Sequence, residues 1–182
     1  MNRLLYSLLP VFTILLLGCT QDQHQSPYSG QESLEIKALT TQEVEGFLNG
    51  MGMGLSKVAE LNQYPGPKHV LELVDQLELS DQQREQTEAL FNQMKKEAVE
   101  IGEVYIAKER ELNRQFESDE VSSSVVDSLL VEIGKIKGSL RAVHVNTHIN
   151  MKDILTSDQI NKYDQLRGYG EGDTSHNHQN HS

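Results

Sequence analysis

Two histidines that lie four residues apart, His144 and His148, are the side chains in this sequence best suited to chemistry. On a helix, residues at this spacing share one face, so both imidazoles can bind the same ion. Imidazole nitrogens suit divalent transition metals such as zinc, nickel and cobalt. The alternative is structural, because His144 borders an apolar stripe with Leu140 and Val143, where a histidine usually packs and forms hydrogen bonds. The spacing alone leaves both interpretations open.

Three further histidines lie within six residues near the end of the chain, at His176, His178 and His181. Such a cluster can chelate a borderline metal even when the backbone is disordered. The surrounding residues 170–182 are polar and include glycine. A solvated, disordered tail that binds no metal explains this composition equally well.

The single cysteine, Cys19, follows a short apolar segment at the start of the chain. Arg3 and the 14 residues Leu4–Leu17 are typical of a secretory signal peptide, whereas a membrane span needs about 20 residues. The run Leu16-Leu17-Gly18-Cys19 resembles the lipobox of bacterial lipoproteins, which implies a signal peptide over residues 1–18 and lipidation of Cys19. The alternative is an uncleaved anchor with an incidental cysteine, which leaves the position of the only cysteine unexplained.

Export of this kind places the mature chain in the periplasm, anchored to the envelope membrane by lipid. Thr20 follows the cysteine in place of the aspartate that resembles an inner-membrane retention signal in enteric bacteria, which favours the outer membrane. Because Cys19 carries the lipid, it is neither a disulfide partner nor a metal ligand.

The composition excludes several classes of function. A formal net charge of −11 argues against nucleic-acid binding, which needs clustered lysine and arginine, and suits cations and basic or unfolded polypeptides. There is no tryptophan and aromatic residues make up only 5%, which fits a helical bundle better than a sheet. The sequence contains no phosphate-binding glycine loop, nucleophile elbow or H-E-x-x-H motif, so neither an enzyme nor an organic cofactor is expected.

Residues 19–63 are predicted to form a flexible tether followed by a glycine-punctuated segment, residues 47–55, which lies on the domain as an irregular stretch or a short helix. Up to about residue 42 they are mostly polar, so they cannot bury enough apolar surface to offset the entropy of ordering, and they are predicted to form a flexible tether. In the glycine-punctuated segment that follows, Met51 and Met53 can act as soft metal ligands, but packing is the commoner use of methionine. The breaker Tyr64-Pro65-Gly66-Pro67 then marks the start of a folded domain over residues 64–169.

The folded domain is predicted to be all-α, with two long and two short helices. Apolar residues at helical spacing predict a short helix at residues 70–77, a helix of about 35 residues after Ser80 and another long helix after Ser122. A final short helix is predicted from residue 157 to about residue 166. The linker between the long helices, residues 117–121, is short, so the two should form a long antiparallel hairpin.

Two similar helix starts flank this predicted hairpin. They read Leu79-Ser80-Asp81-Gln82-Gln83 and Leu155-Thr156-Ser157-Asp158-Gln159. Each contains a capping box, in which the N-cap hydroxyl of Ser80 or Thr156 pairs with Gln83 or Gln159. Two such LTxxQ-like motifs around a helical hairpin resemble the Spy/CpxP family of periplasmic proteins, over roughly residues 64–170. The resemblance implies an all-helical fold and, often, an antiparallel dimer shaped like a cradle.

Within that family, the periplasmic metal sensors are most similar in the histidine segment. Their pattern places a histidine and, four residues later, a methionine where this chain has His144 and His148. It also implies two histidines on the first helix and a glutamate on the second. Here only His69 lies near the first pair, since Leu73 stands at the other position, and Glu88 is the nearby carboxylate. The implied ligand set is His69, His144 and His148 with water or Glu88.

Two functions follow from this resemblance. The first is a periplasmic lipoprotein that senses heavy metals or confers resistance to them, binding zinc, nickel or cobalt as a homodimer with an envelope sensor or anti-sigma partner. The alternative is an ATP-independent chaperone that binds unfolded client proteins during envelope stress. A purely structural envelope lipoprotein is a third interpretation, in which neither metal nor client is bound.

Overall fold

The computed structural model of the chain describes residues 26–118 and 120–169. The predicted signal peptide, Cys19 and the three histidines of the tail lie outside these residues. The chain divides into two compact units, residues 1–32 and 33–182. In the first unit, residues 26–32 form turns, in which the amide of Gln31 donates to the carbonyl oxygen of Tyr28.

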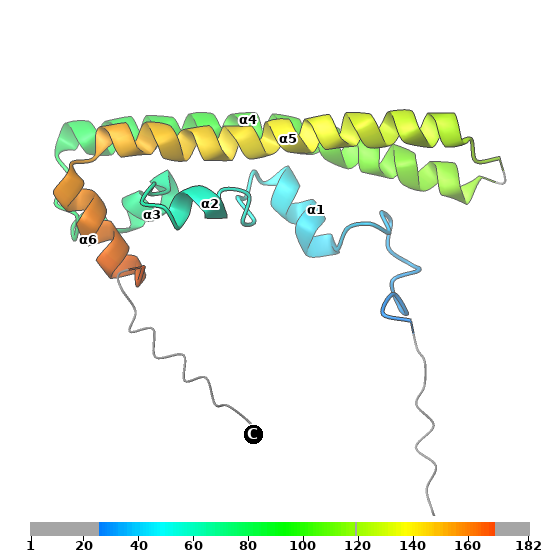
Figure 1. Ribbon diagram of the computed structural model, residues 1–182, viewed down its shortest axis with the longest axis horizontal. Coiled ribbons are helices and arrows are strands. Elements are labelled where there is room, and N and C mark those ends of the chain that lie inside the picture. The colour runs from blue at the N-terminus through cyan, green and yellow to red at the C-terminus, as the bar shows by residue number, and fades with distance from the viewer. Residues whose placement is uncertain (1–25, 119, 170–182) are drawn as a thin grey trace, which may run out of the picture. The chain divides into compact units, whose positions relative to one another are not determined.

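All six helices found in the described residues belong to the second unit (Figure 1). They are α1 (Thr41–Leu48), α2 (Lys57–Glu60), α3 (Pro67–Glu72), α4 (Asp81–Glu117), α5 (Ser123–Ile154) and α6 (Ser157–Arg167). No strand occurs in this part of the chain, so the predicted all-α class is confirmed for it. Two helices, α4 and α5, are long, with 37 and 32 residues. No helix of the described ranges is both long and apolar enough to cross a membrane.

Two helices, α1 and α2, occur in addition to the predicted four. They flank the glycine-punctuated segment, which is expected to be irregular or a short helix lying on the domain. Ordering begins even before α1, because Ile36 and Leu39 are buried, with exposed fractions of 2% and 7%. The backbone amide of Lys37 also donates to Asn113 Oδ1 of α4 at 3.2 Å. A few well-placed apolar side chains therefore order a stretch whose average composition is polar, and the expectation of a tether up to residue 42 is wrong for these residues.

Helix α3 lies earlier in the chain than the apolar spacing predicts. It begins at Pro67, whose fixed φ suits the first position of a helix, and it ends at Glu72. Residues 73–78 form turns, yet Leu77 is buried. The apolar spacing at residues 70–77 thus reflects contact with the core and not a continuous helix.

Helices α4 and α5 lie side by side (Figure 1), and their facing side chains form a core together with α1 and the residues before it. Gly102 of α4 allows α1 to approach closely, because a Cβ at this position would lie 2.3 Å from the carbonyl oxygen of Phe47. The buried residues of this core are Ile36, Leu39, Phe47, Met94, Ala98, Tyr105, Ile106, Ile133 and Leu140.

Both predicted capping boxes are present, at the starts of α4 and α6. Their glutamines also bind each other: Gln83 Nε2 donates to Gln159 Oε1 at 2.8 Å. Gln83 Nε2 further donates to the carbonyl oxygen of Ile154 at 2.9 Å, and Gln159 Nε2 to that of Leu77 at 3.2 Å. The two motifs therefore join the start of α4 to the end of α5. Beside them is a second core of buried residues, formed by Val70, Leu77, Met151, Leu155, Ile160 and Tyr163.

Candidate functional site

His148, on α5, is buried and hydrogen-bonded through both ring nitrogens. Its Nδ1 lies 2.7 Å from the carbonyl oxygen of Tyr64. A carbonyl oxygen can only accept, so Nδ1 carries the proton of this bond. The other nitrogen, Nε2, lies 2.8 Å from Ser56 Oγ. In the neutral imidazole, Nε2 therefore has a lone pair that accepts the hydroxyl proton of Ser56.

The polar groups that contact this imidazole come from one segment, residues 51–64, which we call the strap. It contains α2, which contacts α5. Ser56 is the N-cap residue of α2 and Glu60 is its last residue. Gly66, two residues beyond the strap, lies against the ring, because a Cβ at this position would lie 2.9 Å from His148 Cε1. A larger side chain at Gly66 would require the His148 ring or the backbone at Gly66 to shift.

Glu60 connects His148 to the last helix, α6. Its Oε2 lies 3.5 Å from His148 Nδ1 and forms no hydrogen bond with any described residue. Its Oε1 accepts hydrogen bonds from the hydroxyls of Tyr163 and Tyr169, and Arg167 Nε lies 3.7 Å from the same oxygen. Burial, and after it the bond to Glu60, raises the pKa of Tyr163, so this hydroxyl stays protonated as a donor.

His144 lies one helical turn before His148 and is also buried, with 4% of its surface exposed. It forms no hydrogen bond with any described residue, and its Nε2 is fully buried. Gly52 of the strap lies nearby, since a Cβ there would be 3.8 Å from His144 Nδ1. Burial, and to a smaller extent the proximity of His148, lowers the pKa of His144, so the neutral imidazole is favoured.

Two of the predicted ligands lie together and two do not. His144 and His148 share the buried face of α5, as their spacing predicts. His69 instead forms an ion pair within α3, with its Nδ1 2.8 Å from Glu72 Oε2. Glu88 pairs with Arg84 within α4, with 3.0 Å between Oε1 and Nε. In residues 26–118 and 120–169 no three His, Cys, Asp or Glu side chains form a group that could hold a metal, so His69 and Glu88 do not complete the site.

The sequence reasoning missed the residues that surround His148. Ser56 and Glu60 lie four residues apart, but no motif connects them to a histidine about ninety residues later. The third contact comes from the carbonyl oxygen of Tyr64. Every residue has a main-chain carbonyl, so the sequence does not reveal this contact. Only the neighbouring glycines, Gly52 and Gly66, indicate that the backbone approaches another group here.

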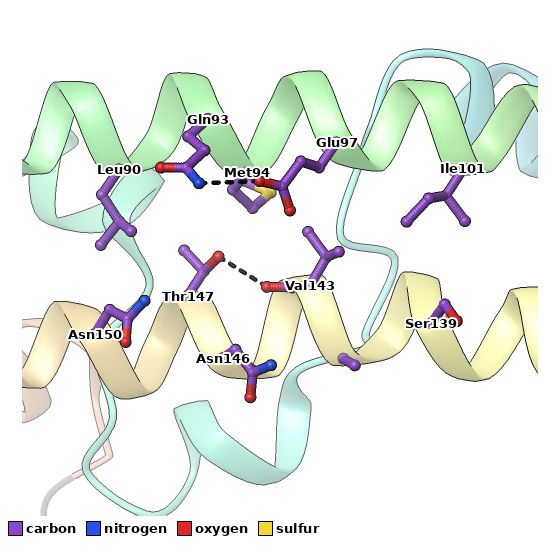
Figure 2. Close-up of a pocket in the computed structure, with 11 residues that line it drawn as sticks. Leu90, Gln93, Met94, Glu97, Ile101, Ser139, Val143, Asn146, Thr147 and Asn150 are labelled. Carbon is purple, nitrogen blue, oxygen red and sulfur yellow. Dashed lines mark hydrogen bonds between the residues drawn. The ribbon is translucent and has the colours of Figure 1, made fainter.

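A groove between α4 and α5 is the second candidate site (Figure 2). It has a volume of about 310 Å³. Gln93 Nε2 donates to Glu97 Oε1 at 3.0 Å, and the Thr147 hydroxyl donates to the carbonyl oxygen of Val143. Other polar side chains of the groove, on α5, have no hydrogen-bond partner among the described residues and are free to bind a ligand. The lining residues are Leu90, Gln93, Met94, Glu97, Ile101, Ser139, Ala142, Val143, Asn146, Thr147 and Asn150.

The histidine site has the donor atoms of a small metal site. Histidines that bind metals usually donate their second ring N–H to a carbonyl or carboxylate oxygen, which fixes the tautomer and the ring. His148 has this arrangement, with Tyr64 as the acceptor and Glu60 close by. His144 adds a neutral imidazole with no competing bond. Two imidazoles are nitrogen donors of the kind that borderline divalent cations prefer, but they are fewer than the three or four protein ligands of a usual zinc site.

Comparison of this chain with known protein families, with curated proteins and with solved structures finds no match. The Spy/CpxP resemblance therefore stays a prediction, which rests on the two LTxxQ-like motifs.

Proposed function

We propose that this chain is a lipid-anchored periplasmic protein that binds a divalent transition metal, similar to the metal sensors and metal-resistance proteins of the Spy/CpxP family. Zinc, nickel or cobalt binds through His144 and His148. The observation that carries the proposal is the hydrogen bonding of the two imidazoles. His144 has a buried nitrogen without a partner, and the Nδ1 proton of His148 is held by a carbonyl oxygen, so that its lone pair is on Nε2, where Ser56 now donates and a metal would take its place.

The unpartnered nitrogen of His144 favours a ligand over simple packing. A buried polar atom without a hydrogen bond costs about 1–3 kcal/mol, and native proteins contain few of them. A metal ion that accepts the lone pair of His144 removes this cost. With only two protein ligands in the described residues, water or hydroxyl groups fill the other coordination positions. Such an open site suits reversible binding, which a sensor needs.

Titration calorimetry with zinc and nickel tests this proposal. The background is a chain in which the three histidines of the tail are replaced by serine, so that α5 holds the predicted site. We expect His144→Gln and His148→Gln each to weaken binding by more than the roughly 10–100-fold typical of a lost outer-shell partner. His69→Gln is the matched control, because His69 lies in a separate ion pair, and it should bind like the parent. Equal affinity in all four proteins would overturn the proposal.

We also propose that α4 and α5 form an antiparallel hairpin that associates into a cradle-like homodimer. The linker of residues 118–122 supports the hairpin, because it is too short for any wide excursion. Apolar side chains left exposed on the two long helices support the dimer. Sedimentation of the lipid-free chain distinguishes a monomer from a dimer. The exposed residues are Val104, Phe116, Val125, Leu130, Val131 and Ile149.

The alternative function, a chaperone for unfolded proteins, is favoured by the groove of Figure 2. Asn146 and Asn150 have amides free to bond the backbone of an extended polypeptide, and apolar residues such as Ile101 line the same space. Glu97 gives the groove a negative charge, which favours basic client segments. The stretch from residue 139 to residue 150 is about 16 Å long, enough for roughly five extended residues.

Suppression of client aggregation by the metal-free chain tests the chaperone function. We expect Ile101→Asp, inside the groove, to weaken suppression. Leu166→Asp is the matched control, because Leu166 is exposed on α6, outside the groove and not on either long helix. If the parent and both variants suppress aggregation equally, the groove is not the client site.

A further inference from the structure

The strap begins with two methionines whose side chains lie at the surface. Met51 is 55% exposed and Met53 is 40% exposed. The other two methionines in the part of the chain that the structure describes, Met94 and Met151, are buried in the two cores, with exposed fractions of 8% and 0%. The packing expected of Met51 and Met53 is therefore partial, and a small oxidant in solution meets these two side chains first.

The sulfur of Met53 occupies the place that a side chain would take at Gly46 of α1. A Cβ at Gly46 would overlap Met53 Sδ and would lie 3.2 Å from both Cγ and Cε. Gly46 is buried, and its carbonyl oxygen accepts a hydrogen bond from the amide of Met51 at 2.9 Å. The thioether and this hydrogen bond hold the glycine-punctuated segment against α1.

The backbone at Met53 has a conformation that favours glycine. Its φ is +39°, and the residues on both sides of it are glycines, Gly52 and Gly54. A residue with a side chain is uncommon at positive φ and persists there only where its surroundings favour it. The contact between the thioether and Gly46 offsets this strain. The conformation of the segment therefore depends on the side chain of Met53.

We propose that Met53 is a site of oxidative modification, at which a peroxide converts the thioether to a sulfoxide and loosens the glycine-punctuated segment from α1. Thioethers react in this way with two-electron oxidants such as hydrogen peroxide. The inference does not depend on metal binding. Its location is nevertheless relevant to the histidine site, because Gly52, directly before Met53, lies beside His144.

The reaction needs only the thioether and the oxidant. A lone pair of the sulfur attacks one oxygen of hydrogen peroxide, so that an S–O bond forms while the O–O bond breaks. The hydroxide that leaves takes up the proton of the transferred oxygen and becomes water. The sulfur loses two electrons and the peroxide gains them, so the product is a sulfoxide and no other group of the protein takes part.

A sulfoxide does not suit the place that the thioether occupies. It is polar and chiral, whereas the thioether is apolar and flexible. Water solvates a sulfoxide far better than it solvates a thioether, so keeping the group against the buried backbone of Gly46 costs hydration. The oxidised side chain is therefore favoured to turn outward. The contact that offsets the positive φ of Met53 is then lost.

Peptide mapping by mass spectrometry, after graded treatment of the lipid-free chain with hydrogen peroxide, tests the selectivity of the modification. We expect Met51 and Met53 to gain one oxygen atom at least about tenfold faster than Met94 and Met151, because a buried sulfur reacts only after the protein opens. If Met51 reacts while Met53 stays unmodified, Met53 is not an oxidation site and the proposal is wrong.

Hydrogen exchange of the oxidised chain tests the consequence. The amide of Met51, which donates to Gly46, should exchange about three- to tenfold faster, the change that one lost weak contact makes to an opening equilibrium. Treatment with methionine sulfoxide reductases should restore the original rate. Amides in the middle of α4 should not change. Met53→Gln, which puts a polar amide in the place of the thioether, should speed the same exchange without peroxide.

Met53→Leu and Met51→Leu form a matched pair, because each removes one surface sulfur and keeps the other. Peroxide should leave exchange at residue 51 unchanged in Met53→Leu and should speed it in Met51→Leu as in the parent. Equal responses to peroxide in the two variants, or oxidation of Met53 without any change in exchange, would overturn the proposal. Zinc binding is measured without peroxide, so the proposed function stands or falls separately.

Discussion

At the scale of single residues, the burial of His144 makes the stability of the metal-free protein depend on pH. Burial, helped by the nearby His148, lowers the pKa of His144 below the value of about 6.5 that imidazole has in an unfolded chain. On acidification the unfolded state therefore takes up a proton before the native state does. The free energy of unfolding should decrease as the pH falls below about 6.5. His144→Leu should reduce this decrease, which urea unfolding in chelator at about pH 7.5 and pH 5 would measure.

His69→Gln is the control for this prediction. His69 is partly exposed and lies beside Glu72, so its loss should leave the acid-induced decrease largely in place. An unchanged pH profile in His144→Leu would mean that His144 does not resist protonation in the folded protein.

How much of the site the sequence can predict depends on how far apart along the chain the contacting residues lie. The histidine pair could be predicted, because a spacing of four residues fixes a shared face on any helix. Ser56 and Tyr64 could not, because they contact His148 from 92 and 84 residues away. Such contacts depend on how the strap crosses α5, which side-chain periodicity does not encode. His69 was placed near the site by analogy alone, and its nearest charged neighbour, Glu72, proved to be local.

At the scale of helices, the paired glutamines explain why Gln and not Glu closes the capping boxes of α4 and α6. Glu can cap a helix equally well, and Glu43 does so at the start of α1. Only Gln also offers an N–H, which Gln83 donates to Ile154 and Gln159. Gln83→Glu should keep the cap but bring a carboxylate against two acceptor oxygens. We expect a loss of about 1–3 kcal/mol in the free energy of unfolding at neutral pH, measured by urea denaturation.

Gln82→Glu is the matched control for Gln83→Glu. Gln82 is exposed in the first turn of α4, where an added negative charge is favourable or neutral. At about pH 3–4 the carboxyl introduced at position 83 takes up a proton and regains a donor, so the loss should shrink there. A loss that is the same at both pH values would place its cause elsewhere.

The contact between α1 and α4 predicts a second effect on stability. A Cβ at Gly102 would lie 2.3 Å from the carbonyl oxygen of Phe47, and backbone cannot move aside as a flexible side chain can. Gly102→Ala should therefore lower the free energy of unfolding by about 1–3 kcal/mol. Gly134→Ala, in α5, is the opposite case: nothing lies within 4 Å of its Cβ position, so it should stabilise the protein by up to about 1 kcal/mol. Thermal unfolding of the two variants, followed by circular dichroism, should shift in opposite directions.

The helices could be predicted wherever their signals are local. The starts of α4 and α6 follow from S/T-x-x-Q motifs, and α1 begins with the same kind of signal, Thr40 and Glu43, which average composition concealed. The ordering of residues 33–40 could not be read in this way. It depends on two apolar side chains, Ile36 and Leu39, that are buried only because the core formed by α4 and α5 accepts them.

At the scale of the whole second unit, Glu60 joins elements that are distant in sequence. It approaches His148 of α5, and it accepts hydrogen bonds from Tyr163 and Tyr169, which lie 103 and 109 residues away. Together with the packing of Leu55 against the core, these bonds connect the strap to α5 and α6. Removing one of them should affect the stability of the unit and not only that of α2.

Tyr163→Phe tests this connection, because it removes one hydroxyl and keeps the buried ring. Tyr163 is fully buried and donates to a carboxylate that is itself 12% exposed. A hydrogen bond to a charged group contributes about 1.5–3 kcal/mol, so the midpoint of urea unfolding should fall accordingly while the transition stays cooperative. Tyr64→Phe is the matched control: Tyr64 binds His148 through its main chain, which the substitution keeps, so the change should be within about 0.5 kcal/mol. If both variants unfold at the parent midpoint, Glu60 does not connect the strap to α6.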